Sequence, residues 1–153
     1  MQNLHFLATI NAPKEKVWHV MLDDATYQEW TRVFSPGGHY KGDWTKGSKM
    51  LFLGPDPVTG KEGGMVSEIA ENKPFEYLSI KHIGIMKNGV EDTTGEEARK
   101  WTPAFENYTL TEKDGSTEVV VDIETADELA EDFSAMWPEA LKKVKEISER
   151  TDL

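Results

Sequence analysis

The sequence predicts an α+β fold in which a curved antiparallel sheet of about seven strands wraps around a long C-terminal helix. Short runs that alternate apolar and polar residues fill much of the chain, as half-buried strands do. Two of these runs flank Asp114-Gly115, which is a strong hairpin signal. From about Asp127 to Arg150, apolar residues instead recur at helical spacing. Sequential hairpins favour antiparallel pairing, and a sheet with this many strands must twist.

The first strand and two short helices are expected at the N-terminal end. The segment "LHFLATI" alternates apolar and polar residues from Leu4 to Ile10. Pro13 fits the first position of a helix, because its missing N–H costs nothing there. The segment "DDATYQEW" predicts a second short helix, whose exposed amides Asp23 or Asp24 can cap.

Six further strands are predicted after the "SPGG" turn at 35–38. The polar segment "NGVEDTTGEEARKW", residues 88–101, interrupts them and is longer than an ordinary hairpin loop. Long ordered loops are often lids or binding loops, so Trp101 could act as an apolar plug at a pocket mouth. The strands are expected at 39–44, 49–54, 64–71, 75–86, 104–113 and 116–125.

The C-terminal helix combines a broad apolar stripe with an internal proline. Pro138 cannot donate the normal helical hydrogen bond. The sequence therefore predicts either a kink near Ser134–Trp137 or a fresh helix start there. An apolar cavity is expected between this helix and the curved sheet. The stripe consists of Leu129, Phe133, Met136, Trp137, Ala140, Leu141, Val144 and Ile147.

The composition is that of a globular protein and disfavours several classes of function. A chain of 153 residues suits one domain, expected to span 1–153. The net charge of −11 repels nucleic acids and anionic lipid surfaces, so neither is an expected partner. No apolar run is long enough for stable membrane insertion. The N-terminal segment does not have the pattern of a signal peptide, which makes a cytoplasmic location the default expectation.

No pattern in the sequence predicts a metal or a cofactor. The absence of cysteine excludes disulfides and thiolate zinc sites. The histidines form no HExxH pattern, and no pair stands four residues apart. A nucleophile elbow, a P-loop and a dinucleotide fingerprint are also missing. The four histidines are His5, His19, His39 and His82.

His82 and Glu106 are the two polar residues best placed to carry chemistry. By strand parity, His82 shares a face with Ile80, and Glu106 shares a face with Tyr108. If both faces point inward, the two side chains could bind a ligand or act as acid and base. The alternative is a histidine at the cavity rim that is hydrogen-bonded to the structure, and a glutamate turned to solvent by a register slip. We expect the alternative, because most strand glutamates are solvated.

The segment "INAPKEKVWHVMLDDATYQEW" resembles the N-terminal signature of the SRPBCC or START-like superfamily, the fold of birch-pollen allergen. The match lies in Ala12-Pro13, in the pair Val17-Trp18 and in Trp30. The segments "GGMVSEIAENKPFEYLSI", "ENYTL" and "TEVVVDIE" are similar to later strands of that superfamily. The segment "WPEALKKVKEISE" resembles the terminal helix of its branch related to activators of the heat-shock-protein-ninety ATPase. The resemblance covers nearly the whole chain.

The resemblance implies a helix-grip fold with an internal pocket, and it suggests three functions. The leading hypothesis is the binding of a small hydrophobic molecule such as a lipid or a polyketide. One alternative is a cyclase or dehydratase that uses His82 and Glu106. The other is a chaperone-binding module. The expected pocket lining is Phe52, Leu78, Ile80, His82, Tyr108, Leu110, Phe133, Met136 and Trp137, with Trp101 as a lid.

Overall fold

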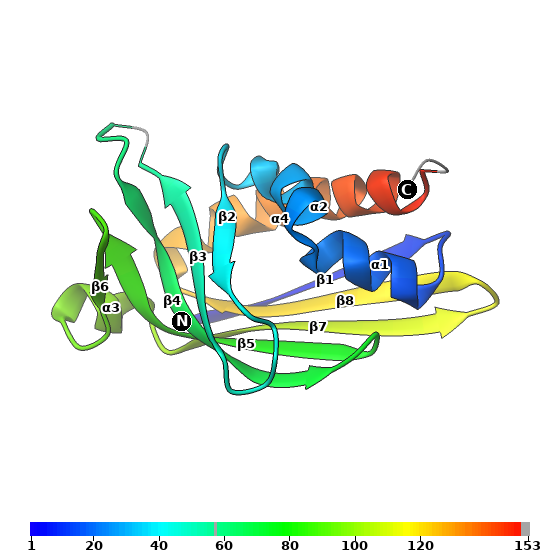
Figure 1. Cartoon of the computed structure of the whole chain (residues 1–153), viewed down its shortest axis with the longest axis horizontal. Helices are drawn as coiled ribbons and strands as arrows, with labels where there is room; N and C mark the ends of the chain where they lie inside the picture. The colour runs from blue at the N-terminus through cyan, green and yellow to red at the C-terminus, as the bar shows by residue number, and fades with distance from the viewer. Residues whose placement is uncertain (57, 151–153) are drawn as a thin grey trace.

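A computed structural model describes residues 1–56 and 58–150. One antiparallel sheet curves around the long C-terminal helix, and two short helices lie on the same side of the sheet (Figure 1). The predicted α+β fold is confirmed. The strands are β1 (Gln2–Ile10), β2 (His39–Gly42), β3 (Lys49–Pro55), β4 (Glu62–Lys73), β5 (Tyr77–Lys87), β6 (Val90–Asp92), β7 (Ala104–Lys113) and β8 (Ser116–Thr125). The helices are α1 (Lys14–Leu22), α2 (Asp24–Trp30), the 3-10 helix η1 (Thr31–Val33), α3 (Glu96–Trp101) and α4 (Asp127–Ser148).

The sheet has eight strands, one more than the prediction of about seven. Its order is β1-β8-β7-β5-β4-β3-β2, and the additional strand β6 pairs with β5. Both β6 and α3 lie inside the segment 88–101, for which the sequence predicts a polar loop. Three residues in β6 and six in α3 are too few for hydrophobic periodicity to reveal.

The hairpin of β7 and β8 forms as predicted. Its turn residues Asp114 and Gly115 have φ values of 54° and 82°, as a two-residue hairpin turn of the primed type requires. The register runs without a shift and pairs Tyr108 with Val121 and Leu110 with Val119. All four of these side chains are buried, so this face of the hairpin points toward the helices.

Helix α4 is continuous through Pro138, so the predicted alternative of a fresh helix start is wrong. Pro138 is exposed, and therefore its ring does not disturb the packed face of the helix. Trp137 before it and Leu141 after it are both buried in the same core, which holds the two halves together. The loss of one helical hydrogen bond is small beside this burial. A kink near Ser134–Trp137 stays a prediction.

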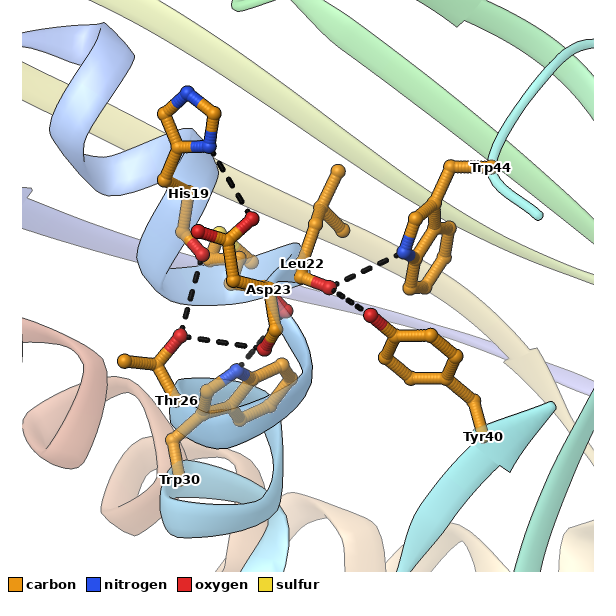
Figure 2. Close-up of polar contacts among 8 residues, drawn as sticks. His19, Leu22, Asp23, Thr26, Trp30, Tyr40 and Trp44 are labelled. Atoms are coloured by element: carbon orange, nitrogen blue, oxygen red, sulfur yellow. Dashed lines mark hydrogen bonds and ion pairs between the residues drawn. The ribbon is translucent and has the colours of Figure 1, made fainter. Parts of the chain in front are cut away.

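The junction between α1 and α2 is held by side chains that donate to carbonyls in the last turn of α1 (Figure 2). The indole N–H of Trp30 donates to the Met21 carbonyl at 3.1 Å. The Tyr40 hydroxyl and the Trp44 indole N–H both donate to the Leu22 carbonyl, at 2.6 and 3.1 Å. These bonds satisfy carbonyls that a helix end leaves without partners.

The prediction that Asp23 or Asp24 caps α2 with its side chain is wrong. Asp23 occupies the N-cap position, but its carboxylate makes no capping bond. The Asp23 carboxylate instead lies 3.2 Å from the His19 ring, while the Thr26 hydroxyl contacts the His19 and Asp23 carbonyls (Figure 2). The tight connection to α1 offers this other partner, which a capping rule based on α2 alone does not consider.

Candidate functional site

A cavity of about 620 Å³ lies between the sheet and α4. Helix α2 and the segment that follows it form one wall, and the first half of α4 forms another. The strands β3, β4, β5, β7 and β8 contribute the rest, together with α3 at the exposed end. A volume of this size is within the range of pockets that take small molecules.

Aromatic rings make up much of the cavity wall. Trp137 of α4 lies 5.9 Å from Trp30 of α2 and 5.0 Å from Phe34, measured between ring centroids. Phe133, one turn earlier on α4, lies 6.1 Å from Phe34 in an edge-to-face arrangement. Such rings give a ligand a large apolar surface of fixed shape, because they support one another by edge and tilted contacts.

A chain of polar side chains crosses the buried end of the cavity. The His82 ring joins two of its members: Nδ1 lies 2.6 Å from the Ser67 hydroxyl, and Nε2 lies 3.0 Å from Glu106 Oε1. The Tyr108 hydroxyl donates to the other Glu106 oxygen. The pairing of β5 with β7 brings His82 and Glu106 together. Ile80, which is two residues before His82 on β5, stands opposite Glu106 on β7.

The expectation that Glu106 turns to solvent is therefore wrong. Its side chain is 23% exposed, and that of His82 is 12% exposed. No register slip occurs along β7, so Glu106 keeps the inward parity of Tyr108. The condition for acid–base chemistry, that the His82 and Glu106 side chains come within hydrogen-bond reach, is met.

The order Ser67, His82, Glu106 superficially matches a serine hydrolase triad. Ser67, however, is fully buried between β3 and β5 and does not line the cavity. A nucleophile must reach its substrate, so the Ser67 hydroxyl is placed to orient the His82 ring rather than to attack.

Two tyrosine hydroxyls complete the polar end of the cavity. Burial, and then the nearby charge of Glu106, raise the pKa of Tyr27 and the pKa of Tyr108 well above the usual range for tyrosine. Both hydroxyls are therefore protonated hydrogen-bond donors at neutral pH. The Tyr108 hydroxyl is used by Glu106, whereas the Tyr27 hydroxyl makes no hydrogen bond to any residue that the structure describes.

The structure places only part of the predicted lining at the cavity. Leu78, Ile80 and Leu110 have the expected inward parity, but they are buried in the core and do not reach the cavity wall. Helix α1 contacts β7 and β8, and its buried side chains belong to the same core as these three residues. Met136 is half-buried on α4 and also lies off the wall. Predicted residues that do line the cavity are Phe52, His82, Tyr108, Phe133, Trp137 and Trp101.

Tyr27 is a lining residue that the sequence analysis did not identify. Helix α2 has seven residues, so its apolar spacing does not show which side faces inward. Glu97 and Trp101 of α3 lie at the exposed end of the cavity, where the Lys100 ammonium lies 5.4 Å from the Trp101 ring. The role of Trp101 as a lid stays a prediction.

No three or more His, Cys, Asp or Glu side chains in residues 1–56 and 58–150 are arranged to hold a metal ion. None of the helices in these ranges has the length and apolar character needed to cross a bilayer.

Solved structures of the same architecture come from several bacteria. Protein MLL2253 of Mesorhizobium loti superposes with a TM-score of 0.72 at 15% identity, over 99% of this chain and 100% of its own. Protein NE0264 of Nitrosomonas europaea gives 0.71 at 14% identity, over 95% and 92%. CalU16 of Micromonospora echinospora gives 0.66 at 16% identity, over 96% and 76%. At these identities the similarity shows the fold alone.

Sequence comparison identifies the family. No curated protein matches the sequence. The family described as "Activator of Hsp90 ATPase homolog 1-like protein" matches residues 11–149. Because this match spans most of the chain, the protein belongs to the Activator of Hsp90 ATPase homolog 1-like family, in agreement with the resemblance to that branch of the SRPBCC superfamily.

Proposed function

We propose that the protein binds a small hydrophobic molecule in the cavity between the sheet and α4. The observation that carries this proposal is a cavity of about 620 Å³ with aromatic walls and a few polar groups at its buried end. Binding sites for small molecules have this composition, because apolar surface supplies affinity and a few polar groups fix orientation. A lipid or a polyketide has the required apolar body.

The proposal is tested by titrating the purified protein with N-phenyl-1-naphthylamine, a neutral apolar dye that fluoresces when bound. We expect saturable binding at one site per chain. Leu129→Trp adds bulk to a residue that lines the cavity from α4, and we expect it to abolish binding. Leu7→Trp, on the exposed side of β1, is the matched control and should bind normally. Equal binding by both variants would place the dye outside the cavity and contradict the proposal.

A second candidate function is acid–base catalysis of the cyclase or dehydratase type. The observation in its favour is the 3.0 Å contact between His82 and Glu106 inside the cavity. Glu106 could remove a proton from a carbon next to a carbonyl, and the Tyr27 hydroxyl could donate to the carbonyl oxygen. In a β-hydroxy ketone, the enolate electrons would then form the carbon–carbon double bond and expel the β-hydroxyl, which leaves as water with the proton that Glu106 had taken up.

This second function requires a result that binding alone does not produce. A hydrophobic β-hydroxy ketone incubated with the protein should lose water at a rate that depends on Glu106. Glu106→Gln keeps the size of the side chain and removes the base, so it should still bind but not turn over the ketone. If the ketone binds to the native protein without any turnover, this second function is excluded for that substrate.

The chaperone-binding alternative has less support. The large apolar side chains that are strongly exposed in the described residues are Met1, Leu7, Val58 and Val90. They come from three parts of the chain, the β1 segment, the connection between β3 and β4, and β6, and four side chains offer little apolar area to such a partner. A cytoplasmic location remains a prediction.

A further inference from the structure

We infer that the cavity selects apolar molecules whose polar head is an uncharged or cationic hydrogen-bond donor, an alcohol or an amine, and rejects molecules with an anionic head. This inference rests on the proposed binding function and specifies its ligand. It excludes the free carboxylates of fatty acids, which would otherwise fit a cavity with such walls.

The charges around the cavity support the inference. Four carboxylates line it among the described residues, at Asp56, Glu97, Glu106 and Glu124, against one lysine, Lys87. Lys87 is exposed at the end of β5, so it cannot neutralise an anion at the buried end. The whole chain also carries a net charge of −11. An anionic head would thus be repelled on approach and find no cation inside.

The hydrogen-bonding groups at the buried end of the cavity support the inference independently of the charges. His82 and Tyr108 approach different oxygens of Glu106, and a carboxylate offers about four acceptor positions in all. Glu106 can therefore accept one more bond from a ligand. Tyr27 lines the same cavity, and its hydroxyl has no hydrogen-bond partner among the described residues. An alcohol head can donate to Glu106 and accept from Tyr27 at once.

An anionic head fits these groups poorly. A carboxylate has only acceptors, so it could use the Tyr27 donor but would face the Glu106 carboxylate without a donor to offer it. Loss of its hydration would then not be compensated, which makes burial of the charge costly. An ammonium head is a donor and can pair with Glu106.

The test compares three ligands that differ only in the head: decanol, decylamine and decanoate. Each competes with bound N-phenyl-1-naphthylamine at neutral pH, below its aggregation concentration. We expect decanol and decylamine to bind at least about tenfold more tightly than decanoate, a difference that a displacement titration resolves easily. Equal or tighter binding of decanoate would overturn the inference while leaving the proposed binding function intact. Failure of the dye itself to bind would instead count against the proposed function.

Two variants assign the selectivity to its residues. Glu106→Gln should raise the affinity for decanoate and lower that for decylamine, each by about tenfold. Glu118→Gln changes the net charge equally from an exposed position on β8, and it should leave the order of affinities unchanged. If both variants change the affinities in the same way, the selectivity comes from overall charge and the assignment to the cavity is wrong.

Tyr27→Phe provides a second test that does not depend on the folding of the Glu106 variant. Decanol should lose about fivefold in affinity, because its oxygen loses one donor. Decylamine should be unaffected, because an ammonium group has no acceptor for the tyrosine hydroxyl. An equal loss for both ligands would contradict the two-point contact with Tyr27 and Glu106.

Discussion

His82 and Glu106 are joined by a 3.0 Å contact between Nε2 and Oε1, across the neighbouring strands β5 and β7. Ser67 fixes the other ring nitrogen of His82, and Tyr108 donates to the second oxygen of Glu106. The carboxylate is thus held in one orientation before any ligand arrives. This arrangement explains how a mostly apolar cavity can present one defined acceptor to a ligand.

The contact predicts a measurable coupling between the two residues. His82→Leu should destabilise the fold by about 1–3 kcal/mol, because it leaves the fully buried Ser67 hydroxyl without its partner. Glu106→Leu removes the acceptor of the buried Tyr108 hydroxyl and should cost a similar amount. The double variant should lose less than the sum of the single losses, as measured by urea unfolding. Strictly additive losses would show that the contact contributes nothing to stability.

Tyr27 predicts a loss of stability at alkaline pH that a phenylalanine at this position would reduce. Because the pKa of Tyr27 is raised in the folded state, its contribution to stability is complete below the ordinary tyrosine pKa of about 10 and is lost as pH rises above it. Tyr27→Phe removes the ionisable group, so it should reduce the loss of stability above that pH. At neutral pH it should cost little, since the hydroxyl has no described partner.

Tyr108→Phe should behave differently, because the Tyr108 hydroxyl is bound to Glu106. We expect this variant to lose about 1–3 kcal/mol of stability already at neutral pH. Urea unfolding of both variants and the native protein at neutral and alkaline pH makes the comparison. Two phenylalanine variants with the same stability at neutral pH would contradict the hydrogen-bond assignment.

Local patterns were sufficient to predict much of the fold. Alternation in β7 and β8, with Asp114-Gly115 between them, placed the hairpin correctly to the residue. Strand parity also gave Glu106 the same face as Tyr108, but we expected a register slip to turn Glu106 to solvent, and the structure shows no such slip. These features depend on contacts between neighbours in sequence or on adjacent strands, which periodicity and turn chemistry report directly.

The boundary between packed core and open cavity could not be predicted in the same way. Leu78 and Phe52 are both apolar strand residues, yet one is core and the other lines the cavity. The difference depends on where the helices pack against the sheet, which is a tertiary relationship. Likewise Tyr27 lies on a helix too short for its apolar spacing to reveal an inward face, so its place in the cavity wall required the structure.

The shared acceptor in the junction of α1 and α2 predicts non-additive losses. Tyr40 and Trp44 both donate to the Leu22 carbonyl, so either single phenylalanine substitution leaves one donor in place (Figure 2). The double substitution removes both, and its cost should exceed the sum of the single costs by about 1 kcal/mol. Urea unfolding of the four proteins measures this difference. A double variant no worse than the sum would mean that water replaces both donors.

Gly64 should be far less tolerant of substitution than Gly60, although both have positive φ. In β4, Gly64 has a φ of +141°, and an added Cβ would overlap the Phe52 carbonyl on the paired strand β3. Backbone would have to move on two strands that line the cavity, so Gly64→Ala should cost at least about 3 kcal/mol. Gly60 has a φ of +72° and open space around the added atom, so Gly60→Ala should cost only about 1 kcal/mol. Thermal and urea unfolding compare the two variants, and the dye titration reports whether the cavity survives. Equal, small losses would show that β3 and β4 can separate at this point without disturbing the site.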